Sequence, residues 1–144
     1  FVELFNRWLQ ELDEQLANAQ AGASSVPEGL LQMAGMAQHV FGATDRHLSI
    51  FIEFWTKARR DPALWKAMIE PYHRYRDYFS GIIKSGIKEG TLRKVNADMA
   101  AQVLVSLAVG LVLQGVLDPT GAEWGKVARQ AVQMLLDGLR VQQD

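Results

Sequence analysis

The sequence contains no cysteine among its 144 residues. Disulfide bonds, thiolate catalysis and zinc or iron–sulfur centres held by cysteine are therefore excluded. The sequence also lacks a basic excess, because 15 lysine and arginine residues are balanced by 16 aspartate and glutamate residues. A protein that binds nucleic acid by itself usually carries a clear basic excess. The composition therefore argues against nucleic-acid binding by these residues alone.

Motifs for catalysis and metal binding are missing as well. None of the three histidines has a second histidine three or four residues away with which to share a metal. No Gly-x-Ser-x-Gly nucleophile motif occurs. The glycines at 81, 86 and 90 fall within or at the end of an expected helix, not in a phosphate-binding loop. We therefore expect no enzymatic activity, no metal and no cofactor.

Apolar residues spaced three and four apart recur along nearly the whole chain. About half of the sequence is apolar (49%), which is enough for the core of one domain. Runs of alternating β-branched residues, which would indicate strands, are absent. Prolines at helix starts and glycines after helix ends divide the pattern into six segments. The sequence predicts a single all-α domain over residues 1–144, with helices at about 1–19, 27–42, 44–60, 62–89, 96–117 and 123–141.

The stretch EFWTKARRDP, residues 53–62, places two aromatic residues beside two arginines and raises the question of a nucleic-acid surface. Ten of the fifteen basic residues lie between Lys57 and Lys94, but acidic residues are interspersed among them. On a helical wheel the aromatic residues of the fourth helix lie opposite its charged face, where Glu70 has Lys66 and Arg74 at i,i+4 spacing. Asp61 and the proline after it have the composition of a helix start. We interpret the stretch as a junction between two helices.

Aromatic and methionine residues of the first four helices can converge on their inner faces, with both aromatic residues of EFWTKARRDP on the inward side of the third helix. Such a cluster is either solid core or the wall of an adaptable ligand pocket. Arg76 falls among the apolar positions, where it can pair with a carboxylate such as Glu53 or meet an anionic ligand. The predicted ligand-binding residues are Trp8, Met36, His47, Phe54, Trp55, Tyr72, Tyr75, Arg76 and Phe79.

The fifth helix is apolar around nearly its whole circumference and has no charge between Met99 and Leu117. Polar residues dilute the run, so we favour a helix buried in protein over a transmembrane span. One of its faces then needs a partner beyond its own domain. With the sixth helix it can form a four-helix bundle between two copies. The predicted dimer-interface residues are Val103, Leu107, Gly110, Leu111, Gln114, Trp124, Val127, Ala131, Met134 and Leu135.

The succession of helices resembles the C-terminal regulatory domain of TetR-family transcription regulators. The resemblance covers essentially the whole chain. It rests on the segments EFWTKARRDPALWKAMIEPYHRYRDYFSGIIKSGIKEGTLR, NADMAAQVLVSLAVGLVLQGVLDP and QAVQMLLDGL.

The resemblance implies a cytoplasmic homodimer joined by its last two helices, with a small-molecule cavity among the earlier helices. Effector binding there would move the first helix, residues 1–19, and release operator DNA. The helix-turn-helix domain that reads the operator is expected before Phe1 and is not part of this sequence. Inducer-contacting residues differ among members of the family, so no ligand motif is carried over.

We therefore expect the ligand-sensing and dimerisation domain of a TetR-type regulator, most simply a repressor, with a mostly apolar or aromatic effector. Two other functions remain open. One is a helical homodimeric interaction module whose aromatic cluster is solid core. The other is a small helical enzyme acting on a hydrophobic substrate, which would need two titratable groups that converge in a cleft.

Overall fold

Six α-helices make up the computed structural model, which describes residues 2–43 and 45–142 and, for residues 37–51, the backbone alone. No strand occurs in these two ranges, and this confirms the all-α class. The helix ends lie close to the predicted positions. The helices are α1 (Val2–Ala21), α2 (Val26–Ala43), α3 (Asp45–Ala58), α4 (Pro62–Glu89), α5 (Ala97–Leu117) and α6 (Trp124–Leu139).

Local capping residues set the ends of the two longest helices. The Asp61 carboxylate accepts hydrogen bonds from two backbone amides in the first turn of α4, and Pro62 provides a backbone already suited to a helix start. At the other end Gly90 has a φ of 84°, a left-handed conformation that favours glycine. The Asn96 side chain caps α5 by accepting from the amide of Met99 at 3.0 Å. The junction predicted in EFWTKARRDP is therefore confirmed.

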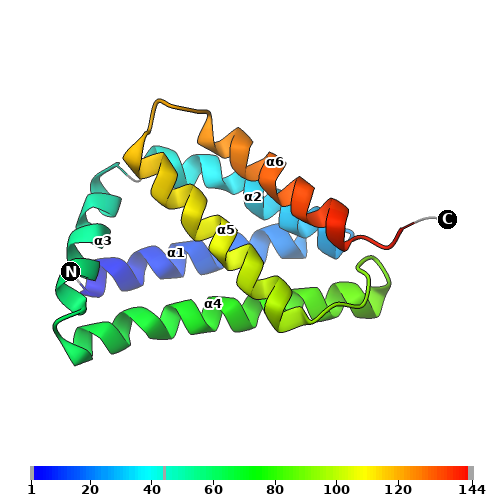
Figure 1. Cartoon of the computed structure of the whole chain (residues 1–144), viewed down its shortest axis with the longest axis horizontal. Coiled ribbons are helices and arrows are strands. Elements are labelled where there is room, and N and C mark those ends of the chain that lie inside the picture. Colours follow the sequence, from blue (N-terminus) through cyan, green and yellow to red (C-terminus); the bar gives the residue numbers. More distant parts are fainter. Residues whose placement is uncertain (1, 44, 143–144) are drawn as a thin grey trace.

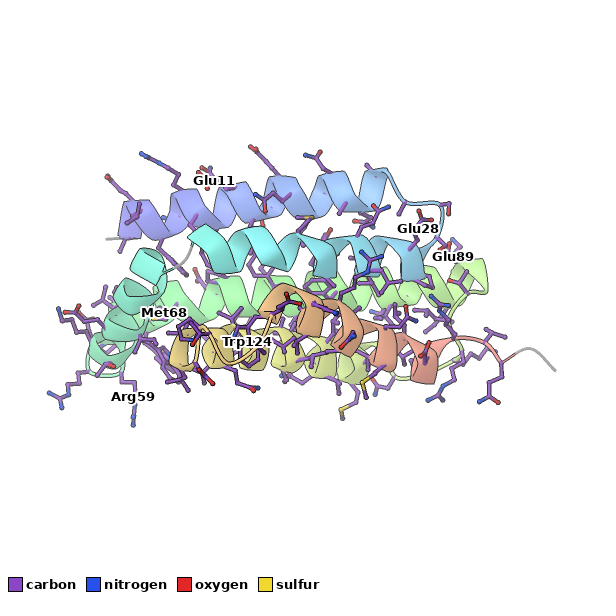
Figure 2. All side chains as sticks on the ribbon, turned by 90° about the horizontal axis from the view of Figure 1, so that it is seen from above. Glu11, Glu28, Arg59, Met68, Glu89 and Trp124 are labelled. Carbon is purple, nitrogen blue, oxygen red and sulfur yellow. The ribbon has the colours of Figure 1, made fainter. Side chains whose placement is uncertain are left out.

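The helices form three layers, with α1 on one side, α2 and α4 in the middle, and α5 and α6 on the other side (Figures 1 and 2). Of the middle pair, α2 packs against both α1 and α6, whereas α4 packs against α5. The short helix α3 lies across the end of the molecule where α1 begins, and it packs mainly against α4. This arrangement places α5 and α6 together on one outer surface.

The core fills the space between α1, α2, α4, α5 and α6. Its most completely buried large side chains are Ile83, Leu92 and Leu136. The loop between α4 and α5 is joined to the end of α6 by backbone hydrogen bonds, one of them from the amide of Arg93 to the carbonyl of Leu139 at 2.9 Å. The guanidinium of Arg93 also donates to the carbonyl of Gly138. These bonds attach the C-terminal end of α6 to the loop between α4 and α5.

Within the part of the chain that the structure describes, one helix is long and apolar enough to cross a membrane, judged by length and composition alone. This helix is α5. Its buried residues include Ala101 and Leu104, which pack inside the domain. Core helices of soluble proteins pass the same test, so α5 fits a helix that belongs to the packed domain.

Candidate functional site

Four of the predicted ligand-binding residues lie in two apolar clusters. Phe54 of α3, only 7% exposed, packs with Ala58 and Met68 in a small cluster between α3 and α4. Met36, Tyr75 and Phe79 instead pack against the main core. The structure thus divides these four residues between two sets of neighbours.

An aromatic contact that the sequence did not single out joins α1 to α3. The ring of Phe5 lies 6.2 Å from the ring of Trp8 and 6.4 Å from the ring of Phe54, measured between centroids. Phe5 belongs to the apolar stripe of the first helix, so its periodicity was visible in the sequence. Its contact with Phe54, 49 residues away in the chain, was not.

Trp55 and His47 do not belong to either cluster as described. Trp55 was expected on the inward side of α3, and this expectation is wrong, because the residue is 52% exposed. Adjacent residues in a helix point about 100° apart, so a narrow contact face that buries Phe54 leaves Trp55 outside. His47 lies outside the residues whose side chains the structure describes.

Arg76 does not pair with Glu53. Its Nε lies 4.0 Å from Oδ1 of the adjacent Asp77, whereas Glu53 forms an ion pair with Lys57 at 3.0 Å. The guanidinium of Arg76 is partly exposed. The ion pair with Asp77 is therefore a weak one, and the Arg76 guanidinium remains accessible to a ligand.

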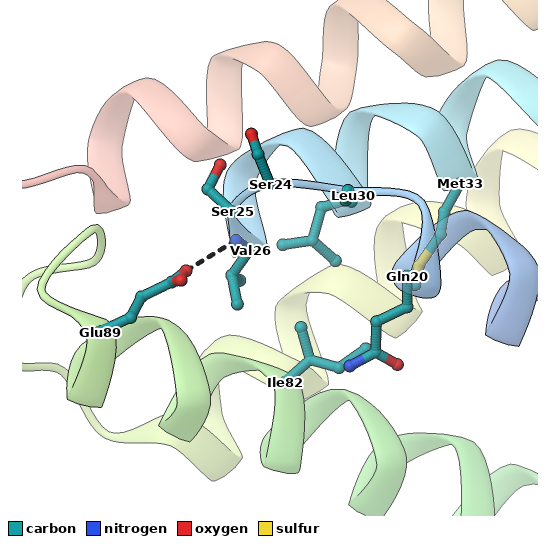
Figure 3. A pocket seen from close by; sticks show the side chains of 10 residues that line it. Gln20, Ser24, Ser25, Val26, Leu30, Met33, Ile82 and Glu89 are labelled. Carbon is teal, nitrogen blue, oxygen red and sulfur yellow. Dashed lines mark hydrogen bonds between the residues drawn. The ribbon is translucent and has the colours of Figure 1, made fainter.

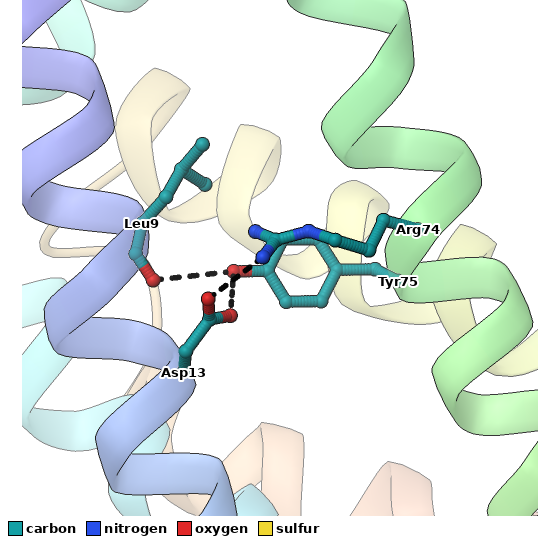
Figure 4. Close-up of polar contacts among 4 residues, drawn as sticks. All are labelled: Leu9, Asp13, Arg74 and Tyr75. Atoms are coloured by element: carbon teal, nitrogen blue, oxygen red, sulfur yellow. Dashed lines mark hydrogen bonds and ion pairs between the residues drawn. The ribbon is translucent and has the colours of Figure 1, made fainter.

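The hydroxyl of Tyr75 donates a hydrogen bond to Oδ1 of Asp13 in α1 at 2.7 Å (Figure 4). The neighbouring Arg74 donates from Nη1 to Oδ2 of the same carboxylate at 2.9 Å, and its guanidinium lies 5.1 Å from the centroid of the Tyr75 ring. Arg74 was expected to pair with Glu70 on a solvated face. That expectation is wrong, because a charged hydrogen bond to α1 takes its place. Lys66 does lie near Glu70, at 3.8 Å.

Burial, followed by the hydrogen bond to Asp13, raises the pKa of the Tyr75 hydroxyl well above its ordinary value. The hydroxyl therefore stays protonated at neutral pH and acts as a donor. Burial likewise raises the pKa of Tyr78. The hydroxyl of Tyr78 donates to the side chain of Gln20 at 2.9 Å, which makes a second link from α4 to α1.

Tyr72 faces the opposite layer. Its hydroxyl accepts a hydrogen bond from Nε2 of Gln102 in α5 at 2.6 Å. Tyr72 and Tyr75 both belong to the predicted ligand-binding set, and both hydroxyls are engaged inside the chain. An effector that meets either hydroxyl would have to share or replace an existing bond.

A small cavity of about 180 Å³ opens where the loop between α1 and α2 lies over the end of α4 (Figure 3). Its lining includes Gln20, Leu30, Met33, Ile82 and Glu89, and none of the predicted ligand-binding residues. One oxygen of Glu89 accepts from the backbone amide of Val26 at 2.7 Å, where a carboxylate suits a helix N-terminus. The cavity is smaller than the roughly 300 Å³ at which ligand pockets usually begin.

The outer surface of α5 and α6 exposes a series of large apolar side chains. Of the predicted interface residues, Val103, Gln114 and Met134 are exposed, and Leu107, Gly110, Trp124, Val127, Ala131 and Leu135 are partly buried. Leu111 differs from the rest, because at 8% exposure it packs inside its own chain. The sequence had not singled out four further exposed residues of α5, which are Met99, Val109, Leu113 and Leu117.

The described residues offer little for chemistry at this site. They contain no group of three or more histidine or acidic residues that could hold a metal ion. Asp13, Arg74 and Tyr75 are the titratable groups that converge between α1 and α4, and they satisfy one another. The arrangement suits binding and conformational coupling between helices.

These features define a class: an all-α domain with an aromatic-rich side and an apolar outer face. The family model for the C-terminal domain of BetI-type transcriptional repressors matches residues 28–142. The chain therefore belongs to this family of TetR-type transcription regulators. No curated protein matches the chain significantly.

Solved structures of transcriptional regulators share the fold. A regulator from Saccharomonospora viridis in complex with choline aligns with a TM-score of 0.81 at 20% identity, over 98% of this chain and 73% of that one. A regulator from Pseudomonas aeruginosa PAO1 gives 0.82 at 20% identity, over 95% and 66%. A TetR regulator from Haloarcula marismortui gives 0.77 at 17% identity, over 97% and 73%. At these identities the likeness establishes the fold.

Proposed function

We propose that this chain is the effector-sensing and dimerisation domain of a TetR-type transcriptional repressor. The observation that carries the proposal is the family match over residues 28–142. The protein would act in the cytoplasm as a homodimer, without catalytic activity, metal or cofactor. Operator DNA would be bound by a helix-turn-helix domain that precedes Phe1 in the full protein.

Dimerisation is assigned to the outer face of α5 and α6. Its support is the exposure of large apolar residues, above all Met134 at 75% and Leu117 at 73%. An apolar surface of this kind on a soluble domain marks an interface. Gly110 adds to the argument, because a Cβ built there would meet no atom of its own chain within 4 Å. A glycine inside a helix costs about 1 kcal/mol relative to alanine, and close approach of a partner helix would explain its presence.

Effector binding is assigned to the region between α1, α3 and α4. Its support is the concentration of aromatic rings there, including the contacts from Phe5 to Trp8 and Phe54. Aromatic faces accept apolar groups and organic cations alike. Choline, the molecule bound in the similar regulator from S. viridis, is therefore a reasonable first compound beside apolar aromatic molecules.

Calorimetric titration of the purified chain with choline and a set of apolar aromatic compounds tests this assignment. We expect saturable binding of at least one compound, weakened by Phe54→Ala and by Tyr75→Ala while the dimer persists. Tyr78→Ala is the matched control for Tyr75→Ala, because it removes a tyrosine of the same helix that is not in the predicted set. Unchanged affinity in both Phe54→Ala and Tyr75→Ala would refute the placement of the site.

A homodimeric interaction module with a solid core is the second candidate. The observation that favours it is the modest size of the cavity beside Glu89, about 180 Å³. This function predicts that the chain dimerises but that no small molecule raises its melting temperature. Binding of any compound to the region between α1, α3 and α4 (the α1–α4 side), with one site per chain, would exclude this second candidate.

A further inference from the structure

The helix α1 is attached to the rest of the domain in two different ways. Its backbone lies close to that of α2, whereas α4 is farther away and meets α1 through side chains. Some of these side chains are polar. One crossing is from Tyr78 to Gln20. The other, which we call the Asp13 clasp, consists of the Asp13 carboxylate with Arg74 and Tyr75.

The Asp13 clasp is the stronger of the two crossings. Its carboxylate accepts at 2.7 Å from a half-buried hydroxyl and at 2.9 Å from a guanidinium, so both hydrogen bonds involve a charged group. The Arg74 side chain is itself about half exposed, which limits the contribution of the ion pair. The Tyr75 hydroxyl is therefore its main element. The crossing from Tyr78 is neutral and exposed.

The same hydroxyl has a second acceptor on α1. The carbonyl oxygen of Leu9 lies 3.4 Å from the Tyr75 hydroxyl, one helical turn before Asp13 (Figure 4). A hydroxyl has one proton to donate, and the shorter distance and the charge of Asp13 favour the carboxylate. The Tyr75 hydroxyl thus has two acceptors on α1, and Asp13 is the closer of the two.

The turn of α4 that carries the clasp is also bonded on its other side. Tyr72, one turn earlier, accepts from Gln102 of α5 at 2.6 Å. Residues 72–75 therefore connect α1 in one outer layer with α5 in the other. A displacement of this turn would act on the position of α1, because Arg74 and Tyr75 bond Asp13 of α1 directly.

We propose that Asp13 is the positioning residue of α1, and that opening of its clasp with Arg74 and Tyr75 frees α1 while α5 and α6 stay in place. The regulatory meaning of this opening rests on the proposed function, in which α1 transmits the state of the domain to a DNA-binding segment. The clasp itself requires neither effector nor DNA. It can therefore be tested on the chain alone.

Amide hydrogen exchange of the effector-free chain, read helix by helix, tests the clasp. Tyr75→Phe removes the hydroxyl and keeps the ring, and Asp13→Asn removes the charge at nearly constant shape. In each variant we expect α1 amides to exchange about fivefold faster, the change expected when one ordinary hydrogen bond is lost, and α6 amides to exchange at the wild-type rate. The double variant should be no faster than the faster single variant, because both changes open one clasp.

Tyr78→Phe is the matched control, since it deletes the neutral crossing to Gln20, and it should leave α1 exchange within about twofold. Arg74→Gln, at an exposed position, supplies a third variant that is expected to fold. Unchanged α1 exchange in Tyr75→Phe, Asp13→Asn and Arg74→Gln would overturn the proposal. An equal acceleration in α1 and α6, or an equal effect of Tyr78→Phe, would also overturn it. Measuring the mass and effector affinity of the same samples tests the proposed function separately.

Discussion

The α5–α6 face and the α1–α4 side of this domain differ in how their apolar residues are covered. On α5 and α6, large apolar side chains such as Met134 and Leu117 remain exposed in the single chain. On the α1–α4 side, Phe54 and Met68 are covered within the chain, and hydrogen bonds from tyrosines complete the contacts between helices. Its exposed apolar residues, Trp55 among them, gather where α1 begins, near the end of α3 and the start of α4.

This difference suits the two surfaces to different functions. An apolar face without polar bridges suits permanent association, because burial against a second copy costs no existing hydrogen bond. A set of helices joined by polar side chains suits rearrangement, because hydrogen bonds can exchange partners at low net cost. The sensing and dimerising functions of a repressor domain would thus be separated on its two sides.

The largest expected effect comes from charge on the α5–α6 face. Leu113→Asp together with Met134→Asp should convert the dimer to a monomer, at a cost of about 4 kcal/mol or more, because symmetry buries each unpaired carboxylate twice. The change should be read as a halved mass at unchanged helix content by circular dichroism. Trp65→Asp, at an exposed apolar position of α4, is the control and should remain dimeric. A dimer that survives the double substitution would place the interface elsewhere.

Truncation of Phe54 should have the next largest effect. Phe54→Ala leaves a cavity beside Met68 and should lower the free energy of unfolding by about 3 kcal/mol. The adjacent Trp55→Ala should cost less than about 1 kcal/mol, because Trp55 is already half exposed. Chemical denaturation of both variants measures the difference. Equal losses would mean that Trp55 contributes as much to the packing of α3 as Phe54 does.

A smaller effect is expected from substitution of Gly86, near the C-terminal end of α4. A Cβ at Gly86 would lie 2.5 Å from Cδ1 of the buried Leu92, so Gly86→Ala should destabilise the chain by about 1–3 kcal/mol. Gly81 lies in the same helix with no atom near its Cβ direction. Gly81→Ala should therefore stabilise by about 0.5–1 kcal/mol. Thermal unfolding should show a lower melting temperature for Gly86→Ala and a higher one for Gly81→Ala. An unchanged melting temperature in Gly86→Ala would show that the Leu92 side chain can move aside.

The smallest effect is expected from the titration of Tyr75. Its pKa is raised in the folded state by burial and by Asp13, so its contribution to stability is full below the ordinary tyrosine pKa of about 10 and is lost as the pH rises above that value. Tyr75→Phe should be less stable than the wild type at pH 8, and the gap should narrow at pH 11. Melting temperatures at the two pH values measure this. A gap that stays constant would mean that the hydroxyl is not buried as described.

The helices could be predicted from the sequence because their signals are local. Asp61 with Pro62, Gly90 and Asn96 mark helix ends by the chemistry of one or two neighbouring residues. The apolar outer face of α5 was likewise visible, because a helix apolar on all sides cannot cover itself. The exposure of Met99 and the burial of Leu111 did not follow from this pattern.

The aromatic side was harder to predict, because its contacts join distant parts of the chain. Tyr75 was singled out as pocket wall, but its partner Asp13 lies 62 residues away. Arg74 had a local partner by spacing in Glu70, and it bonds Asp13 instead. Helical periodicity identifies a broad apolar face of a helix. It could not show which of two adjacent aromatic residues is buried, so it did not separate buried Phe54 from exposed Trp55.

The mass of the chain in solution tests the account most directly, since both the proposed function and the division between the two sides require a dimer. Light scattering on the purified chain, over a range of concentrations, should give twice the mass of one 16.1 kDa chain. A mass equal to one chain at every concentration would contradict the account.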